Sequence, residues 1–185
     1  MNKRAIELTI NFIVLFILSM AMFATGIMIM RNLFHKVDVI KDKLTEQQRV
    51  QLERILSNSP DKIVALFSSK EIKSGEHDVF GIGVRNDLDH DANFYIDIEC
   101  DAAFDRKKAT ICDDDTANNC NIYDIWMKAT PGPYLIKHND KLILDIFAMV
   151  PKNAPKGTFI FNVRIREGST TGTQYGTTKK LNVIV

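Results

Sequence analysis

An uncharged run at residues 10–30 constrains the fold of this chain more than any other feature. At about 1.5 Å rise per residue, a helix of this length matches the roughly 30 Å hydrocarbon core of a bilayer. The run is apolar on all sides, unlike an amphipathic surface helix, and the rest of the chain is too small to bury it. The sequence therefore predicts a transmembrane helix surrounded by membrane lipid.

A short basic tip, MNKRA, precedes this run. A cleaved secretory signal has an apolar region of about 7 to 15 residues and then a small-residue cleavage site. The run here is longer and reaches Arg31 without such a site, which indicates a retained, single-pass anchor. We expect residues 1–43 to hold the basic tip, the transmembrane helix and its helical extension.

A second helical pattern predicts an amphipathic helical stalk at residues 44–60. Thr45 and Gln48 have the spacing of a capping box, and Pro60 closes the segment. Apolar residues recur at helical spacing between them, at Val50, Leu52, Ile55 and Leu56. The helix either packs on its own domain or lies at the membrane interface, or its apolar stripe joins copies of the chain as a coiled coil.

From residue 61 the hydrophobic period changes from helical to two. Apolar residues occupy alternate positions in five runs, at 80–84, 94–98, 142–146, 159–165 and 181–185, with turn signals between them. One apolar and one polar face per strand is typical of an antiparallel sheet. The predicted fold class is an N-terminal transmembrane α-helix plus an all-β, immunoglobulin-like sandwich of about 7–9 antiparallel strands in residues 61–185.

Three cysteines, Cys100, Cys112 and Cys120, lack the C-x-x-C spacing of zinc or redox sites. The simplest interpretation is a Cys112–Cys120 disulfide that closes a short polar loop, and Cys100–Cys112 is the alternative. Disulfides favour an oxidising compartment. The positive-inside rule alone favours a cytoplasmic C-terminal side, but acidic residues are interleaved with those cations. We predict a cell-membrane protein whose C-terminal domain is extracellular.

Composition and motifs argue against several function classes. The net charge of +1 provides no global basic field, so we predict no nucleic-acid partner. The sequence contains no G-x-S-x-G, H-E-x-x-H, Walker or G-x-G-x-x-G motif. We therefore predict a non-enzymatic protein without a catalytic residue or an organic cofactor.

Two acidic clusters are weak calcium candidates. Asp87, Asp89 and Asp91 alternate in one, and Asp113 and Asp115 belong to the other. Calcium takes six to eight oxygen ligands, which acidic loops at the end of a sandwich can supply. Neither cluster completes an EF-hand loop. Solvated turn residues are the alternative interpretation.

The N-terminus resembles that of type IV pilin-like proteins, particularly the archaeal class that includes archaellins and their accessory subunits. The residues that carry the resemblance are Lys3, Arg4, Ala5 and Glu7, followed by the long hydrophobic helix. The resemblance implies that Glu7 is an assembly residue. The alternative for Glu7 is an interfacial carboxylate favoured by the helix dipole.

The C-terminal part is similar to immunoglobulin-like and CARDB-like modules of bacterial and archaeal surface proteins. The segments GIGVRND, ANFYIDIEC, VPKNAPKGTFIFNVRI and TTKKLNVIV carry this similarity. Together these patterns predict a membrane-anchored surface protein that binds an envelope protein or its own copies. The alternatives are a processed pilin-like filament subunit and an accessory domain that binds or hydrolyses surface glycans.

Overall fold

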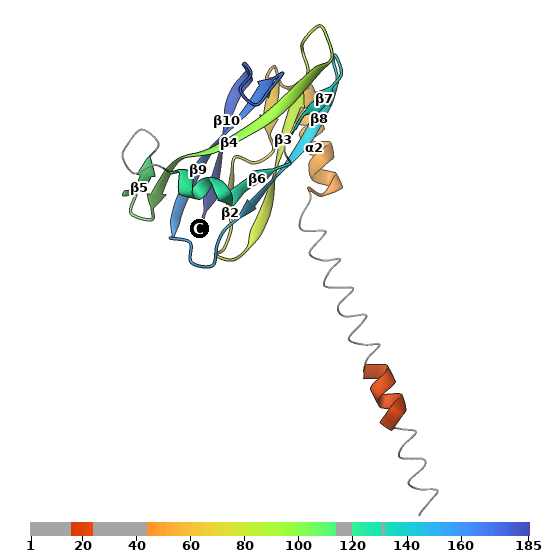
Figure 1. Cartoon of the computed structure of the whole chain (residues 1–185), viewed down its shortest axis with the longest axis vertical. Coiled ribbons are helices and arrows are strands. Elements are labelled where there is room, and N and C mark those ends of the chain that lie inside the picture. The colour runs from red at the N-terminus through yellow and green to blue at the C-terminus, as the bar shows by residue number, and fades with distance from the viewer. Residues whose placement is uncertain (1–15, 24–43, 114–119, 131) are drawn as a thin grey trace, which may run out of the picture. The chain divides into compact units, whose positions relative to one another are not determined.

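The computed structural model describes residues 16–23, 44–113, 120–130 and 132–185 (Figure 1). The chain divides into two units, Met1–Lys41 and Asp42–Val185. In the first unit, residues 16–23 are helical and their large apolar side chains are exposed, from 55% at Leu18 to 72% at Phe23. The other residues of the predicted span lie outside the described part. Within the described ranges, no helix is long and apolar enough to cross a membrane.

The second unit contains one α-helix, one 3₁₀ helix and ten strands in its described part. In chain order these are α2 (Glu46–Asn58), β1 (Ile63–Ala65), β2 (Ser69–Glu71), β3 (His77–Arg85), β4 (Ala92–Asp105), β5 (Thr110–Asp113), η1 (Asn121–Trp126), β6 (Met127–Ala129), β7 (Tyr134–Ile136), β8 (Lys141–Met149), β9 (Gly157–Glu167) and β10 (Gln174–Ile184).

The strands form two sheets, as predicted for a β-sandwich. One sheet has the order β1-β3-β8-β6, and the other has the order β2-β10-β9-β4, with β5 and β7 both paired to β4. Two details of the prediction are wrong. The described part has ten strands instead of about seven to nine, and β2 pairs with β10 in parallel. The predicted all-antiparallel pattern therefore holds for the other strand pairs only.

Two segments that change sheets account for the additional strands. β1 pairs with β3 in one sheet, and β2, a few residues later, pairs with β10 in the other. Likewise β6 pairs with β8, and β7 pairs with β4 across the sandwich. Each of these four strands is three residues long, too short for alternating hydrophobicity to reveal. Short edge strands also limit edge-to-edge aggregation.

The core lies between the two sheets and uses the apolar faces that the sequence predicts. Residues 159, 161, 163 and 165 of β9 are all at most 1% exposed. On the other face of β9, Arg164 and Arg166 form ion pairs with Glu99 and Asp97 of β4, with Arg166 Nη2 2.8 Å from Asp97 Oδ2, while Asn162 is 6% exposed. The period-two pattern therefore identifies the buried face correctly in β9.

β3 departs from this alternation because both of its faces are buried. Val79 is 2% exposed, although it lies on the face opposite Phe80. A Cβ placed on Gly81 would lie 2.6 Å from Leu44 Cδ1 and 3.1 Å from Leu52 Cδ2. The absence of a side chain at Gly81 thus lets the N-terminal part of this unit pack directly on the strand.

The helix α2 occupies this second face of β3. Leu52 and Leu56 are fully buried there, and the capping box predicted at Thr45 and Gln48 is present. Arg49 Nη2 also pairs with Asp145 Oδ2 of β8 at 2.5 Å. Leu52 and Leu56 of the predicted stripe therefore pack on their own domain, as the first alternative for this segment expects, whereas Val50 and Ile55 of the same stripe are 56% and 37% exposed.

Candidate protein-interaction site

The helix η1 directly precedes β6 (Figure 1). Aromatic contacts anchor its inner side. Trp126 is 5% exposed, and its ring centroid lies 4.5 Å from that of Phe159 on β9. The Tyr123 centroid lies 4.9 Å from Phe159 and 5.2 Å from Trp126. Such aromatic pairs contribute about 0.5–1.5 kcal/mol each beyond area burial, so they fix η1 on the sandwich.

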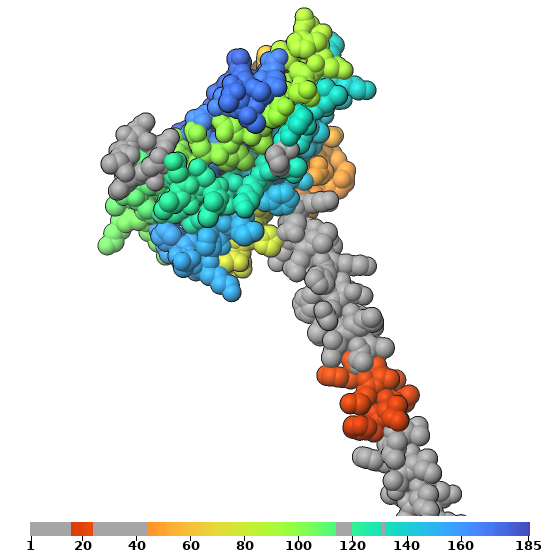
Figure 2. All heavy atoms as spheres, viewed as in Figure 1, coloured from red at the N-terminus to blue at the C-terminus, as the bar shows by residue number. Residues whose placement is uncertain are grey.

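The outer side of η1 is apolar as well. Ile122 is 69% exposed and Ile125 is 67% exposed. A 3₁₀ helix has three residues per turn, so side chains three residues apart lie one above the other. The same spacing places Tyr123 and Trp126 together on the inner side. We call Ile122 and Ile125 the isoleucine stripe; η1 lies at the surface of the face shown in Figure 2.

Two further contacts hold η1. The Asp124 carboxylate accepts a hydrogen bond from the backbone N–H of Cys100 on β4, with Oδ1 and N 2.6 Å apart. Cys120, directly before η1, forms a disulfide with Cys112 of β5. These contacts hold η1 at its start, in its middle and along its inner side. The isoleucine stripe therefore lies on a rigidly held element.

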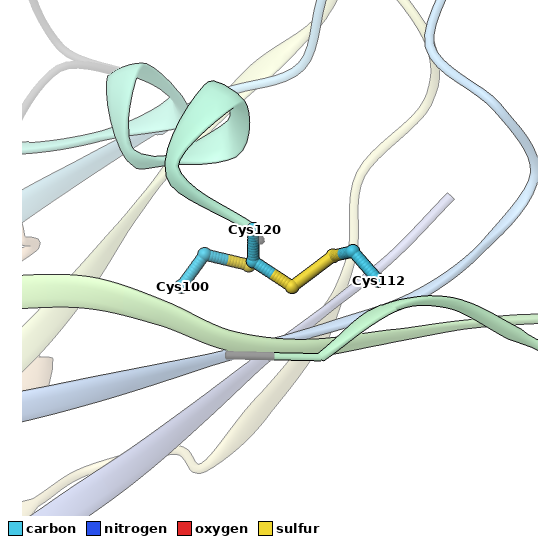
Figure 3. Close-up of side chains that lie close together, drawn as sticks. All are labelled: Cys100, Cys112 and Cys120. Carbon is cyan, nitrogen blue, oxygen red and sulfur yellow. A yellow bond between two sulfur atoms is a disulfide. The ribbon is translucent and has the colours of Figure 1, made fainter. Parts of the chain in front are cut away.

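The disulfide confirms the Cys112–Cys120 prediction, and the Cys100–Cys112 alternative is wrong for this structure. Cys100 nevertheless belongs to the same cluster, because the three sulfur atoms all lie within 4.8 Å of one another. Their residues are buried, between 0% and 4% exposed. Figure 3 shows the Cys100 side chain pointing toward Cys120, while Cys112 approaches Cys120 from the other side.

The acidic calcium candidates are distributed over separate contacts. Asp87 binds Arg85, with Oδ1 2.6 Å from Nε, and Asp89 Oδ1 lies 2.7 Å from His90 Nδ1. Asp91 Oδ1 accepts the backbone N–H of His138 at 2.9 Å. Among the described residues, the three cysteines are the group of potential ligand atoms that lies close enough to share an ion, and these aspartates are not.

The other predicted site residues are placed only in part. Asp113 ends the edge strand β5 and is partly exposed. Asp115 and Glu7 lie outside the described residues. The calcium site and the assembly role of Glu7 therefore remain predictions.

Ion pairing shifts the acid–base behaviour of the loop after β3. The hydrogen bond from Arg85 lowers the pKa of the Asp87 carboxyl, and the same bond raises the pKa of the Arg85 guanidinium. At the exposed tip, the hydrogen bond between Asp89 and His90 lowers the pKa of Asp89 and raises that of His90. Charge-assisted contacts of this kind stabilise a loop and leave its carboxylates occupied.

Sequence reasoning missed the isoleucine stripe. In the segment that begins at Cys120, only the cysteine itself carries a prediction from the sequence. The sequence pattern that could have revealed the stripe is a period of three residues. Ile122 and Ile125 follow this period, and so do Tyr123 and Trp126, one position later. Six residues are too few to separate this period from that of a turn or a short strand.

Comparison with known proteins gives no family for this chain. No family model matches it, and no curated protein matches it. Among solved structures, a family 123 glycoside hydrolase from Clostridium perfringens is similar at a TM-score of 0.43 and 11% identity, over 63% of this chain and 22% of that one. The ASH/PapD-like domain 7 of human CEP192 is similar at a TM-score of 0.43 and 10% identity, over 69% of this chain and 87% of that one. This chain thus spans less than a quarter of the hydrolase.

Proposed function

We propose that this chain is a non-enzymatic protein whose β-sandwich binds a protein partner through the isoleucine stripe. Single exposed apolar side chains are ordinary on protein surfaces. Ile122 and Ile125 differ because they are stacked and belong to an element held by a disulfide, a hydrogen bond and an aromatic cluster. A preorganised apolar surface loses little conformational entropy on binding. This stripe is the observation that carries the proposal.

The proposed setting is the cell membrane, with the chain as a single-pass protein and the sandwich outside. The uncharged run at residues 10–30 supports the anchor. The disulfide supports an oxidising compartment. The resemblance at Lys3, Arg4, Ala5 and Glu7 supports a pilin-like envelope role with an immunoglobulin-like domain, in which the partner is another envelope protein or a second copy of the chain.

Site-specific photocrosslinking in native membranes tests the interaction. p-Benzoylphenylalanine replaces Ile125 in one variant and Leu135 in a matched control. Leu135 is 64% exposed and lies on β7, which pairs with residues 92–94 at the end of β4 far from Cys100. We expect a discrete adduct from position 125 and none from position 135. Equal adducts at both positions, or none at 125, contradict the proposal; mass spectrometry of the adduct separates a second copy from another protein.

The orientation is tested by cysteine labelling. The native cysteines are at most 4% exposed, so they do not report on the side of the membrane. Thr170 lies in the exposed β9–β10 loop, and Thr170→Cys provides an accessible thiol there. We expect a membrane-impermeant maleimide to label this variant in intact cells. Labelling that requires lysis contradicts an extracellular sandwich.

The filament alternative is separated by sequencing the N-terminus of the native protein. A mature N-terminus at Ala5 or Ile6 supports a processed pilin-like subunit. An N-terminus at Met1 or Asn2 supports the retained anchor.

A further inference from the structure

The cysteine cluster contains a disulfide and a third sulfur close to both of its atoms. Cys100 comes from β4, Cys112 from β5 and Cys120 from the position before η1. All three sulfur atoms lie within 4.8 Å of one another. Three separate elements therefore deliver their sulfur atoms to one buried point, where either of two other disulfides needs only a small side-chain movement.

The arrangement favours one of these two disulfides. Cys100 points toward Cys120, and Cys112 reaches Cys120 from another side (Figure 3). Thiol–disulfide exchange proceeds by attack of a thiolate on one sulfur while the other sulfur leaves. Because all three sulfur atoms lie within 4.8 Å of one another, the Cys100 sulfur stands off the axis of the Cys112–Cys120 bond, and in-line attack on Cys120 requires a rotation of the Cys100 side chain. In that attack Cys112 is the leaving group.

We propose that Cys100, Cys112 and Cys120 form an internal thiol–disulfide exchange site that interconverts Cys112–Cys120 and Cys100–Cys120. Cys100 is 1% exposed, so the exchange begins when the β5 edge opens to solvent. The Cys100 thiol then loses its proton to that solvent, and its sulfur forms a bond to Cys120 Sγ. The Cys112–Cys120 bond breaks, and Cys112 leaves as a thiolate that takes up a proton. No electrons are gained or lost, so the step needs no external oxidant or reductant.

The two isomers have different structural consequences. In both, Cys120 ties the start of η1 to the sheet that contains β4 and β5. In the second isomer, Cys112 becomes a thiol on β5, a four-residue edge strand that pairs with β4 only through residues 102–104. Short edge strands open readily. Exchange therefore moves the thiol from the long strand β4 to the short edge strand β5, whose local opening exposes it to a thiol-reactive partner.

Tryptic peptides distinguish the isomers directly. Trypsin places Cys100 in residues 86–106 and both other cysteines in residues 109–128. The observed disulfide is internal to the second peptide, whereas Cys100–Cys120 joins the two peptides. Native full-length protein is incubated at pH 8.5 without reductant, then unfolded in guanidinium at pH 6.5 with excess N-ethylmaleimide and digested.

We expect wild-type protein to yield the joined peptides with the maleimide on Cys112, beside the internal disulfide with the maleimide on Cys100. Cys100→Ser is the control and should abolish the joined product. Cys112→Ser, incubated with oxidised glutathione as the two-electron oxidant, should form Cys100–Cys120 and leave no alkylated thiol. Maleimide confined to Cys100 in the wild-type protein overturns the proposal whatever the variants show, and two alkylated cysteines in Cys112→Ser also count against it.

Discussion

Leu52→Ala tests whether α2 is an integral layer of the fold. Leu52 is fully buried, and its side chain packs over Gly81 and Gly83, which have no Cβ to fill a vacated space. The substitution removes three carbon atoms, worth about 2.4 kcal/mol at about 0.8 kcal/mol per buried methylene. The cavity that remains adds to this loss. We expect the free energy of unfolding to fall by about 3–4 kcal/mol.

Urea denaturation of the full-length protein in a non-ionic detergent measures this change. Trp126 is the only tryptophan and is 5% exposed, so its fluorescence reports unfolding of the sandwich. Val50→Ala is the matched control, because Val50 lies on the same helix and is 56% exposed. It should change the unfolding free energy by no more than about 0.5 kcal/mol. Equal losses in the two variants would show that α2 does not depend on its contact with β3.

Three other perturbations have defined outcomes. Asn86 is fully buried and its amide donates to the carbonyls of residues 90 and 136, so Asn86→Ala should cost about 2–3 kcal/mol in urea denaturation, whereas exposed Asn93→Ala should cost little. Reducing the disulfide, whose cysteines are 8 residues apart, should lower the unfolding free energy by about 2–3 kcal/mol, measured with and without dithiothreitol. Arg85 lowers the pKa of Asp87, so their pair contributes stability above the ordinary aspartate value of 3.8 that is lost as pH falls through the lower folded-state pKa. In Asp87→Asn the melting temperature should therefore fall less than in the wild-type protein as the pH is lowered. At the most acidic pH values, the two proteins should have the same melting temperature.

The long strands could be predicted because one physical rule decides their side-chain placement. In β9 and β10, solvent covers one face and the core covers the other, so apolar residues must alternate. Leu181 and Val183 are therefore buried while Lys180 is exposed. The capping box at Thr45 was predictable for a similar reason, since both of its hydrogen bonds connect residues three apart in the sequence.

The second layer on β3 could not be predicted from the same rule. Gly81 and Gly83 read as neutral positions on a solvent-facing side of the strand. The glycines allow α2, at residues 46–58, to pack closely on this face of β3. The sequence of β3 itself does not specify that contact. The parallel pairing of β2 with β10 is missed for the same reason, because it joins residues more than 100 positions apart.

The contacts of the acidic clusters could not be predicted from the sequence, because charge alone does not fix a carboxylate's partner. Asp87 and Asp91 have the alternation of a cation loop, but one binds Arg85 two residues away and the other accepts the backbone N–H of His138. The exposure of Ile122 and Ile125 could not be predicted either, because apolar residues next to a tryptophan are typical of a buried core.

The isoleucine stripe also sets a lower limit on the interface that the proposed partner must form. Fully burying an aliphatic side chain is worth about 1.5–3 kcal/mol, and Ile122 and Ile125 have about two thirds of their surface left to bury. Together they offer about 2–4 kcal/mol, which is less than the cost of association for most protein pairs. The stripe therefore cannot act alone and must lie at the centre of a wider contact. A stable complex of this kind buries at least about 1,000 Å² in total. Ile125→Asp should accordingly abolish binding, because it places a charge at that centre, whereas a charge at Leu135, outside the proposed interface, should leave the affinity unchanged.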